Sequence, residues 1–397
     1  MQARMEMRRS MTSRVGTTLL DARGRAWAAA CSSFLTAMVA LALPLSAWGA
    51  APDDRGGDYV GAAICAGCHK DQFEQQSRSG HARSLRPLSR HEDLRSLLDG
   101  IEVEREPGYR YRFFVEEGEL RVTVSGGDAR KTVPVEWAFG AMEQAITFVS
   151  QVDEDRYVEH HLSYYAALQG LAPTPGHQGS RAANAEEALG VYYETFDPQP
   201  KIMRCFQCHS TGPLALGPNL SLEPRELGIR CEACHGPGRA HVEAIANGEP
   251  AKIRASVRNP KNMSARQQTE FCGACHRPPA SDGTSIDWRD PWNVRHQPVY
   301  LTQSKCFVES PGSLSCFTCH DPHKPLLQDA PAYYSGKCRS CHDRPAHPEG
   351  LPVSGNQADS CIGCHMPAVV PQEHLRFTNH WIGIYDPGAV LRPGQAR

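Results

Sequence analysis

The sequence lacks any tract or stripe of basic residues, and it contains a single long apolar run. Lys and Arg number 42 against 44 Asp and Glu in 397 residues. Proteins that bind nucleic acid gather positive charge on one face, so this class is excluded. The apolar run extends from Phe34 to Leu45, and no later window is long enough to cross a bilayer.

The N-terminal segment has the pattern of a secretory signal. Six arginines and two acidic residues accompany the apolar run, small residues follow it at Ala47, Gly49 and Ala50, and a polar chain opens at Pro52. We therefore predict that residues 1–50 are a signal peptide and that the protein is exported, with the periplasm as the expected compartment. An uncleaved membrane anchor or a cell-surface location is the alternative. Loss of this basic segment leaves an acidic mature chain, which suits protein partners with a basic patch.

Cysteine, by contrast, is abundant and follows one pattern. Sixteen cysteines are present, and fourteen of them fall into seven copies of Cys-x-x-Cys-His, the first being Cys65-Ala66-Gly67-Cys68-His69. This spacing places two sulfurs and an imidazole on one helical turn, where the sulfurs can bond to the two vinyl groups of a porphyrin and the imidazole can face its iron. Zinc ribbons and disulfide frameworks also use Cys-x-x-Cys pairs, but neither needs a histidine after every second cysteine.

We therefore predict seven covalently bound haem c groups. The predicted thioether-forming residues are Cys65, Cys68, Cys205, Cys208, Cys231, Cys234, Cys272, Cys275, Cys316, Cys319, Cys338, Cys341, Cys361 and Cys364. The predicted proximal iron ligands are His69, His209, His235, His276, His320, His342 and His365. Cys306 is the cysteine left over in the mature chain; we expect a buried structural thiol, with a redox role as the alternative.

The spacing of the motifs predicts the organisation of the chain. The first two motifs begin 140 positions apart, and the others follow at intervals of 26, 41, 44, 22 and 23. So little chain for each haem cannot build an ordinary core, so we predict a mainly α-helical and irregular, haem-nucleated fold. The expected parts are a first haem module (51–100), a β insert (101–175), a six-haem domain (176–385) and a tail (386–397).

The long gap between the first two motifs predicts an antiparallel β-meander. Aromatic and β-branched residues alternate there, as in Leu120, Val122 and Val124, between turn-like segments. Five or six strands are expected, at Ile101 to Glu106, Tyr109 to Val115, Leu120 to Val124, Thr132 to Trp137, Ala145 to Val152 and Arg156 to Tyr165. We expect this insert to shield haem edges from water; a platform for substrate or partner is the alternative.

Two helices can be placed locally. Ser264-Ala265-Arg266-Gln267 is a capping box that opens a helix leading into Cys272. Arg239 to Ala246 should be helical and should end at Asn247-Gly248.

Histidine is the expected sixth ligand of the irons. Eleven histidines lie outside the motifs, whereas only four methionines follow the signal. The eleven histidines are more than enough to supply a second histidine ligand to each of seven irons. A histidine pair holds the haem potential below that of methionine–histidine ligation. The composition therefore favours a low-potential chain of haems.

Several segments resemble the multihaem cytochrome c superfamily, which includes the nitrifier tetrahaem cytochrome, the hydroxylamine oxidoreductases and the pentahaem nitrite reductases. They are Tyr59-Val60-Gly61, Ser79-Gly80-His81-Ala82, the run from Cys231 to Gly238, Cys316 running into Asp321-Pro322-His323, and Cys361 running into Met366-Pro367. The resemblance implies distal ligands at His81, His241 and His323, and also at His374 and His380.

Two further distal ligands are chosen by position. His177 lies on a turn before the haem-dense segment, and His347 follows its own motif by five residues. His160 and His161 are neighbours in a predicted strand and so point to opposite faces. One of them is the alternative to His347, or a partner that orients a ligand. His91 and His296 are expected not to ligate iron.

The resemblance leaves both carriers and enzymes open. The nitrite reductases replace the motif histidine with lysine, whereas all seven motifs here keep histidine. We therefore predict an electron-relaying cytochrome with redox-protein donors and acceptors and no catalytic residues. One alternative is a reductase or oxidase of nitrite, hydroxylamine or a sulfur oxyanion, with one open haem. Another is a subunit of an outer-membrane or extracellular conduit, in which chains would contact each other haem to haem.

Overall fold

The computed structural model describes residues 56–105, 108–177, 179, 181–197, 199, 201–279, 286–343, 347 and 360–394. The predicted signal, residues 1–50, lies outside this part of the chain. The described residues all belong to one compact unit. Within the described ranges, no helix is both long and apolar enough to span a membrane.

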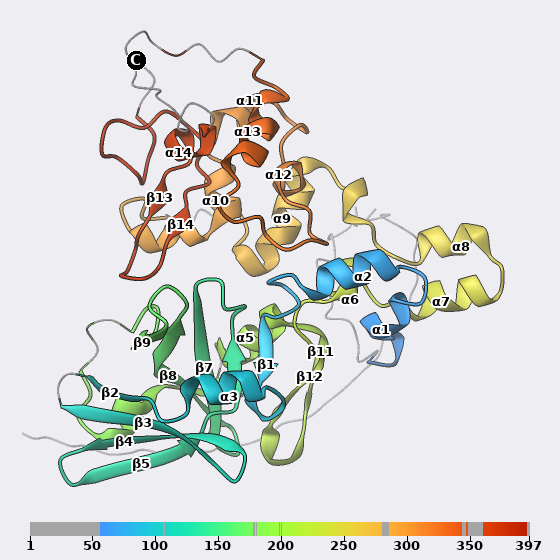
Figure 1. Ribbon diagram of the computed structural model, residues 1–397. Coiled ribbons are helices and arrows are strands. Elements are labelled where there is room, and N and C mark those ends of the chain that lie inside the picture. Colours follow the sequence, from blue (N-terminus) through green and yellow to red (C-terminus); the bar gives the residue numbers. More distant parts are fainter. Residues whose placement is uncertain are drawn as a thin grey trace, which may run out of the picture. The chain divides into compact units, whose positions relative to one another are not determined.

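A four-stranded antiparallel sheet forms part of the predicted insert (Figure 1). Its strands follow one another as β2 (Glu102–Arg105), β3 (Tyr109–Glu116), β4 (Glu119–Gly126) and β5 (Ala129–Pro134). Leu120, Val122 and Val124 are buried, as their alternation predicted. The turn between β3 and β4 uses positive φ at Glu117 (51°) and Gly118 (82°).

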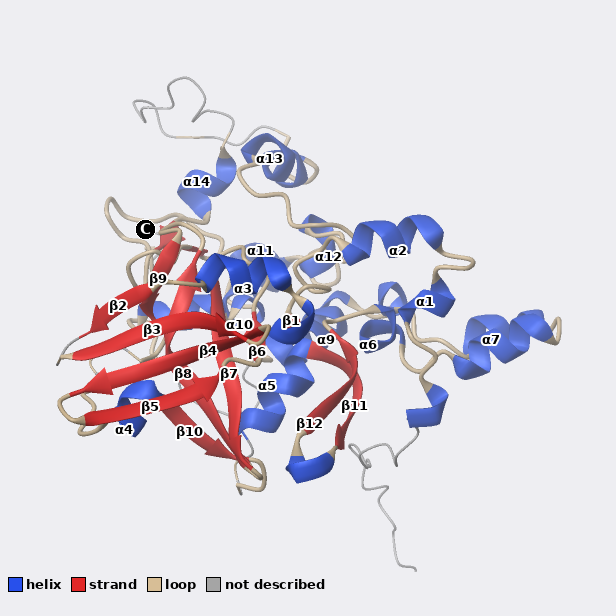
Figure 2. Ribbon diagram, turned by 60° about the horizontal axis from the view of Figure 1, so that its bottom comes forward, coloured by secondary structure: helices blue, strands red, loops and turns tan. Residues whose placement is uncertain are grey.

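A second, six-stranded sheet was not expected. β6 (Trp137–Phe139), β7 (Ala145–Asp153) and β8 (Arg156–Tyr165) pair in order, and β9 (Gly170–Pro173) pairs with β8. β1 (Leu85–Pro87) and β10 (Gly190–Glu194) join from outside residues 101–175 (Figure 2). The prediction of one meander was therefore wrong: the strands divide into two sheets, and the second recruits strands from both neighbouring segments.

The two faces of β8 explain the division into sheets. Residues 160–165 are all buried, so both faces of the strand are covered. Val158, Leu162 and Tyr164 pack in one core with Val122 and Val124 of the first sheet. The opposite face carries Tyr157, which packs with Phe206 of helix α5 (Lys201–His209). The second sheet thus separates the first sheet from the second haem motif.

Short helices carry the rest of the chain. They are α1 (Ala62–Cys65), α2 (Lys70–Ser77), α3 (Glu92–Leu98), α4 (Ala185–Leu189), α6 (Cys231–His235), α7 (Arg239–Ala246), α8 (Pro250–Ala255), α9 (Ala265–His276), α10 (Gln297–Leu301), α11 (Lys305–Glu309), α12 (Cys316–Cys319), α13 (Pro331–Arg339) and α14 (Cys361–His365). Short 3-10 turns η1–η5 lie at Gly56–Asp58, Leu88–Arg90, Pro218–Leu220, Pro260–Asn262 and Pro291–Arg295.

Both local helix predictions are confirmed. Helix α9 begins with the capping box, in which the Ser264 side chain accepts from the Gln267 N–H and the Gln267 side chain accepts from the Ser264 N–H. Helix α7 ends at Ala246, and Gly248 takes a φ of +67°. A hairpin of β11 (Ser210–Leu216) and β12 (Leu222–Leu227), between the second and third motifs, and the short pair β13 (Ala368–Val369) and β14 (Phe377–Thr378) were not predicted.

The haem-dense segment has little apolar core of its own. From Cys205 to His365 the described residues include eight buried hydrophobic side chains: Phe206, Leu222, Ala244, Ala265, Val294, Val299, Tyr300 and Leu301. The β region, by comparison, encloses a continuous core between its sheets. A folded segment with so few buried apolar side chains requires another source of buried surface.

Candidate haem-binding sites

Every Cys-x-x-Cys-His motif forms a helical turn. In four motifs the turn closes helices α5, α6, α9 or α14. In the other three, the histidine N–H donates to the carbonyl of the first cysteine, over 2.8 Å at His69, 2.9 Å at His320 and 2.9 Å at His342. Two sulfurs and one imidazole therefore project from the same turn, as thioether attachment to a porphyrin requires.

The cysteines are available for attachment. All fourteen motif cysteines, and Cys306, are free thiols in the described part of the chain. No disulfide joins any of these fifteen described cysteines. Cys306 is half-buried rather than fully buried.

Four pairs of histidine rings lie at the separation that one iron needs. A metal–imidazole bond of about 2 Å on each side, with the ring radii added, places two ligand rings roughly 6 Å apart. The ring centroids of His81 and His276 are 6.0 Å apart, and those of His235 and His323 are also 6.0 Å apart. His320 faces His380 at 6.3 Å, and His347 faces His365 at 6.2 Å. Each pair joins one motif histidine with one predicted distal ligand.

Backbone carbonyls orient several of these rings. His209 Nδ1 lies 3.0 Å from the Ser84 carbonyl oxygen, His235 Nδ1 is 2.8 Å from that of Arg258, and His365 Nδ1 is 2.8 Å from that of Gly383. Because a carbonyl oxygen only accepts, Nδ1 carries the proton and Nε2 keeps its lone pair. The same contact orients His241, to the Ile253 carbonyl over 2.8 Å, and His380, to that of Thr378 over 3.0 Å.

Burial keeps two of the paired histidine rings neutral. It lowers the pKa of His276 to about 4, with nearby His81 and His209 adding to the effect. Burial also lowers the pKa of His380 to about 4. A neutral imidazole retains the lone pair that binds a metal.

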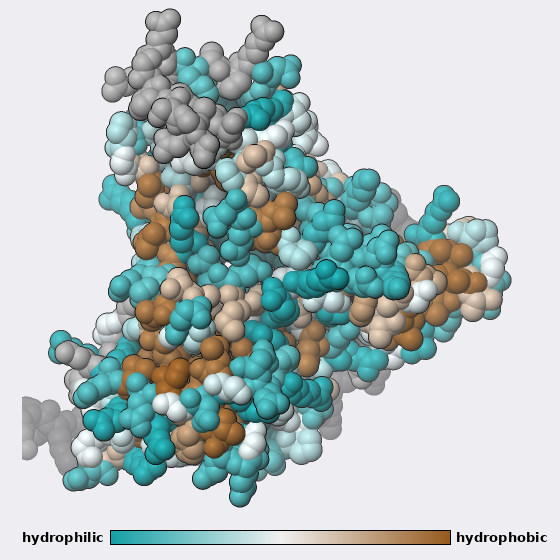
Figure 3. All heavy atoms as spheres, viewed as in Figure 1, coloured by the Kyte–Doolittle hydropathy of each residue, from teal (hydrophilic) through white to brown (hydrophobic). Residues whose placement is uncertain are grey.

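Apolar side chains next to candidate haem-site residues are exposed. Ile64, next to Cys65, is 53% exposed, and Val242, next to His241, is 38% exposed. Figure 3 shows this apolar surface over helix α7. Paired rings, oriented nitrogens and uncovered apolar side chains together fit haem at these motifs.

The remaining predicted distal ligands have other surroundings. His177 is buried, with Nδ1 2.9 Å from Nδ1 of His161 and Nε2 3.5 Å from Glu159. His374 has a φ of +69° and lies 6.0 Å, between ring centroids, from Tyr165. None of these contacts involves a motif histidine, and the ligand assignments of His177 and His374, like those of the other candidate distal histidines, stay predictions.

The neighbouring histidines of β8 point to opposite faces, as predicted. His160 Nε2 lies 2.7 Å from the Ser150 hydroxyl, and His161 contacts His177. His161 is thus placed to orient His177, one of the two roles that the sequence left open. His91, which we expect not to ligate iron, has its Nδ1 3.6 Å from Oδ1 of Asp93.

Motif cysteines also lie beside one another. The thiols of Cys65 and Cys231 are within hydrogen-bonding reach, and so are those of Cys272 and Cys316. The helices behind them pack as well: α1 on α6 and α9 on α12. Further contacts of this kind join Cys208 to Cys275 and Cys338 to Cys361. The sequence could not predict these neighbours, because motif spacing carries no information about long-range packing.

Two protein families match parts of the chain. The family described as "Cytochrome c554 and c-prime" matches residues 177–236, which contain the second and third motifs. The family described as "Doubled CXXCH motif" matches residues 331–369, which contain the sixth and seventh. The chain is a multihaem c-type cytochrome. In both matched segments of the cytochrome, the motifs form helical turns and their cysteines are free thiols, as covalent haem attachment requires.

Other comparisons add little to this assignment. The solved structure "Crystal Structure of Outer Cell Wall Cytochrome OcwA" is similar to the cytochrome at 16% identity, with a TM-score of 0.49, over 82% of this chain and 79% of that chain. The comparison with curated proteins gave no match.

Sequence reasoning missed one residue of the haem region. Glu232, between the cysteines of the third motif, is 3% exposed and accepts hydrogen bonds from three backbone N–H groups. Its position in the sequence could have indicated this role, because Glu232 is an acidic residue inside a haem motif that is followed by Gly236 and Gly238.

Proposed function

We propose that this cytochrome carries seven haems and relays electrons through them, without transforming a substrate of its own. The observation that carries the proposal is the set of four histidine pairs with ring centroids 6.0–6.3 Å apart. A haem iron supplies one-electron redox chemistry, and an iron closed on both sides by histidine exchanges electrons but has no open position for substrate.

The pairs assign distal ligands to four sites. His81 would cap the iron held by His276, and His323 the iron held by His235. His380 would cap the iron held by His320, and His347 that held by His365. His177, His241 and His374 remain the candidates for the three other irons, which are held by His69, His209 and His342.

The packing of the motifs supports a continuous route. Helix α1 packs on α6, α9 on α12, α12 on α13, and α13 on α14. Between α6 and α9, the thiol of Cys234 lies close enough to Cys272 and Cys275 to raise the pKa of both. The second motif connects through Cys208, whose thiol lies within reach of Cys275. The route would therefore extend from the first motif to the seventh, with the second motif as a branch at the fourth.

Histidine ligation and the N-terminal segment indicate the redox partners and the compartment. Bis-histidine ligation holds potentials low, so the proposed donors and acceptors are low-potential redox proteins. The predicted signal at residues 1–50 would export the chain before haem attachment, with the periplasm as the proposed compartment and the cell surface or a membrane anchor as the alternative.

Haem stoichiometry combined with a redox titration tests the proposal. Intact-mass analysis should show seven haems on the mature chain. The Cys65→Ala, Cys68→Ala double variant, which lacks the first attachment site, should show six. A spectroelectrochemical titration should resolve only low-potential transitions. Fewer than seven haems, or a large high-potential fraction, would contradict the relay as proposed.

A reductase is the second candidate, and one observation favours it. Among the ring contacts of the described residues, His209 faces Phe139 at 5.2 Å rather than another histidine. If this iron keeps an open side, small nitrogen or sulfur oxyanions could bind there. Binding of nitrite or hydroxylamine to the oxidised protein separates the two functions.

A further inference from the structure

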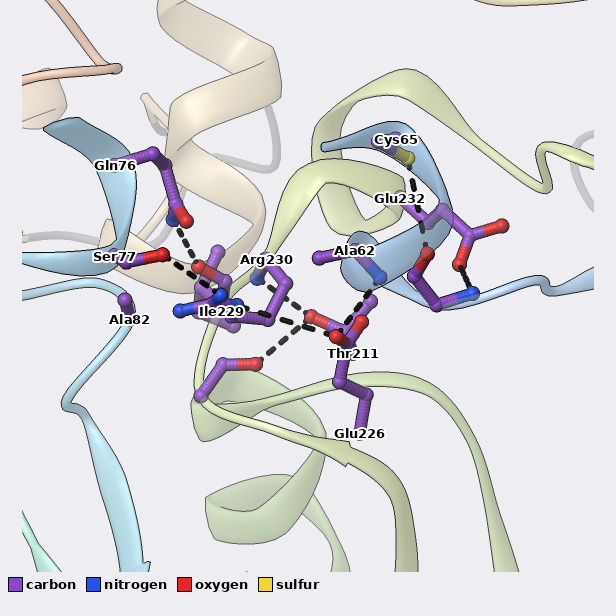
Figure 4. A network of polar contacts seen from close by, with 12 residues as sticks. Ala62, Cys65, Gln76, Ser77, Ala82, Thr211, Glu226, Ile229, Arg230 and Glu232 are labelled. Atoms are coloured by element: carbon purple, nitrogen blue, oxygen red, sulfur yellow. Dashed lines mark hydrogen bonds and ion pairs between the residues drawn. The ribbon is translucent and has the colours of Figure 1, made fainter. Parts of the chain in front are cut away.

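The carboxylate of Glu232 joins three segments of the chain. It accepts hydrogen bonds from the N–H groups of Val60 (2.9 Å) and Gly61 (2.8 Å), at the start of helix α1. It also accepts one from Gly238 (2.7 Å), at the start of helix α7. Figure 4 shows Glu232 reaching from its own motif toward the segment that carries Ala62 and Cys65. Helices α1, α6 and α7 therefore meet at one side chain.

Glycines make this approach feasible. Gly61 has a φ of +85°, which side chains disfavour. A Cβ at Gly238 would lie 3.0 Å from Val60 Cγ2 and 3.1 Å from Glu232 Oε1. Gly236, after the motif, has a φ of +78° and turns the chain from α6 toward α7. The segment Gly236-Pro237-Gly238 thus serves the contact that Glu232 makes.

A second carboxylate completes the anchoring of α1. Glu226 of β12 accepts from the Ala62 N–H over 3.0 Å. Three consecutive N–H groups at the start of α1 are therefore held by acidic side chains from the segment around the third motif. Arg230, 4.0 Å from Glu226, also donates to the Ser77 hydroxyl over 3.0 Å and so ties the end of α2 to the same segment.

Both helices held by Glu232 carry haem-site residues. Helix α1 ends at Cys65, whose thiol is within reach of Cys231. Helix α7 carries His241, whose Nδ1 is fixed on the Ile253 carbonyl so that Nε2 is the ligating nitrogen. Helix α7 also packs on η1, just before α1, where Arg239 donates to the Gly57 carbonyl.

We propose that Glu232 is a positioning residue that holds helix α7 against helix α1 so that His241 caps the haem attached at Cys65. This inference rests on the proposed seven-haem relay and deepens it, because it names the distal ligand of the first haem and the residue that places it. A carboxylate is needed at this position. In Glu232→Gln, one oxygen becomes an NH₂ donor that confronts a backbone N–H, so at least one of the three bonds is lost.

The test compares five holoprotein variants by low-temperature EPR and intact mass, one of them the Glu232→Gln, His241→Ala double variant. Glu232→Gln and His241→Ala are the test variants, and Glu249→Gln is the control. Glu249 lies between helices α7 and α8. Its partly exposed carboxylate accepts a hydrogen bond from Lys252 Nζ over 2.8 Å. Gly238→Ala, which crowds the same contact without changing Glu232, provides a second route if Glu232→Gln gives no protein.

We expect Glu232→Gln to retain seven haems and to show a new high-spin signal equal to one haem. His241→Ala should give the same signal, the double variant should give no more than one, and Glu249→Gln should match the wild type. The proposal is overturned if Glu232→Gln, or Gly238→Ala in its place, keeps the wild-type spectrum, or if its altered signal adds to that of His241→Ala. A wild type with fewer than seven haems would count against the relay and not against the role of Glu232.

Discussion

Truncation of Phe206 should loosen the second haem motif from within. Phe206 lies between the cysteines of Cys205-Phe206-Gln207-Cys208-His209, and its ring is 0% exposed, packed in a core cluster with Tyr157. Three aromatic rings of the second sheet surround it edge-on, with centroids at 5.2, 5.1 and 6.1 Å: Trp137, Phe139 and Tyr157. Phe206→Ala therefore removes the side chain that fixes α5 to the sheet.

The size of the effect follows from this burial. Replacing a buried phenylalanine with alanine costs about 3–5 kcal/mol, including the cavity left behind. With no exposure and three ring contacts, Phe206 should lie near the middle, at about 4 kcal/mol. For a chain of this length, such a loss lowers the melting temperature by about 5 °C.

A matched control exists at the same position of another motif. Phe317 follows Cys316 as Phe206 follows Cys205, but it is only partly buried. Thermal unfolding of the holoprotein, followed by far-UV circular dichroism, should show a loss of about 1 kcal/mol for Phe317→Ala. Equal losses in the two variants, or a loss below about 1 kcal/mol for Phe206→Ala, would refute the idea that α5 is anchored through this ring.

Three further outcomes are expected. His81→Ala should leave the iron of His276 without its partner ring, 6.0 Å away, and add a high-spin EPR signal equal to one haem; an unchanged spectrum would contradict the pairing. Burial lowers the pKa of His160 from 6.5 to about 3, so the unfolded chain binds the proton more readily and stability is lost as the pH falls below about 6.5. Between pH 7 and pH 5 this costs about 2 kcal/mol, and urea denaturation should show that His160→Gln escapes this part of the loss. Cys306→Ser should keep seven haems by intact mass, because its thiol belongs to no motif; loss of a haem would show that it takes part in attachment.

Local pattern was enough to predict the haem motifs and the helices α7 and α9. Each depends on neighbours in sequence: cysteines and histidine on one turn, a capping box at Ser264, a terminating glycine at Gly248. The strands were also predicted near their observed positions, since β8 spans Arg156–Tyr165 as expected.

Long-range pairing lay beyond the sequence. Alternation along a strand shows which residues share a face but not which strand lies beside it, so the division into two sheets was missed. Likewise, the resemblance indicated that His323 ligates iron, but only the fold brings it to 6.0 Å from His235. Glu232 was missed because its three partners come from segments on both sides of the long β region.

A low-temperature EPR spectrum of the oxidised holoprotein, before and after nitrite or hydroxylamine is added, tests the relay most directly. The account predicts low-spin haem alone, unchanged by either ligand, because histidines close every iron. A high-spin signal that shifts when the ligand is added would contradict it, and would make an open haem, with the reductase function, the better description of this cytochrome.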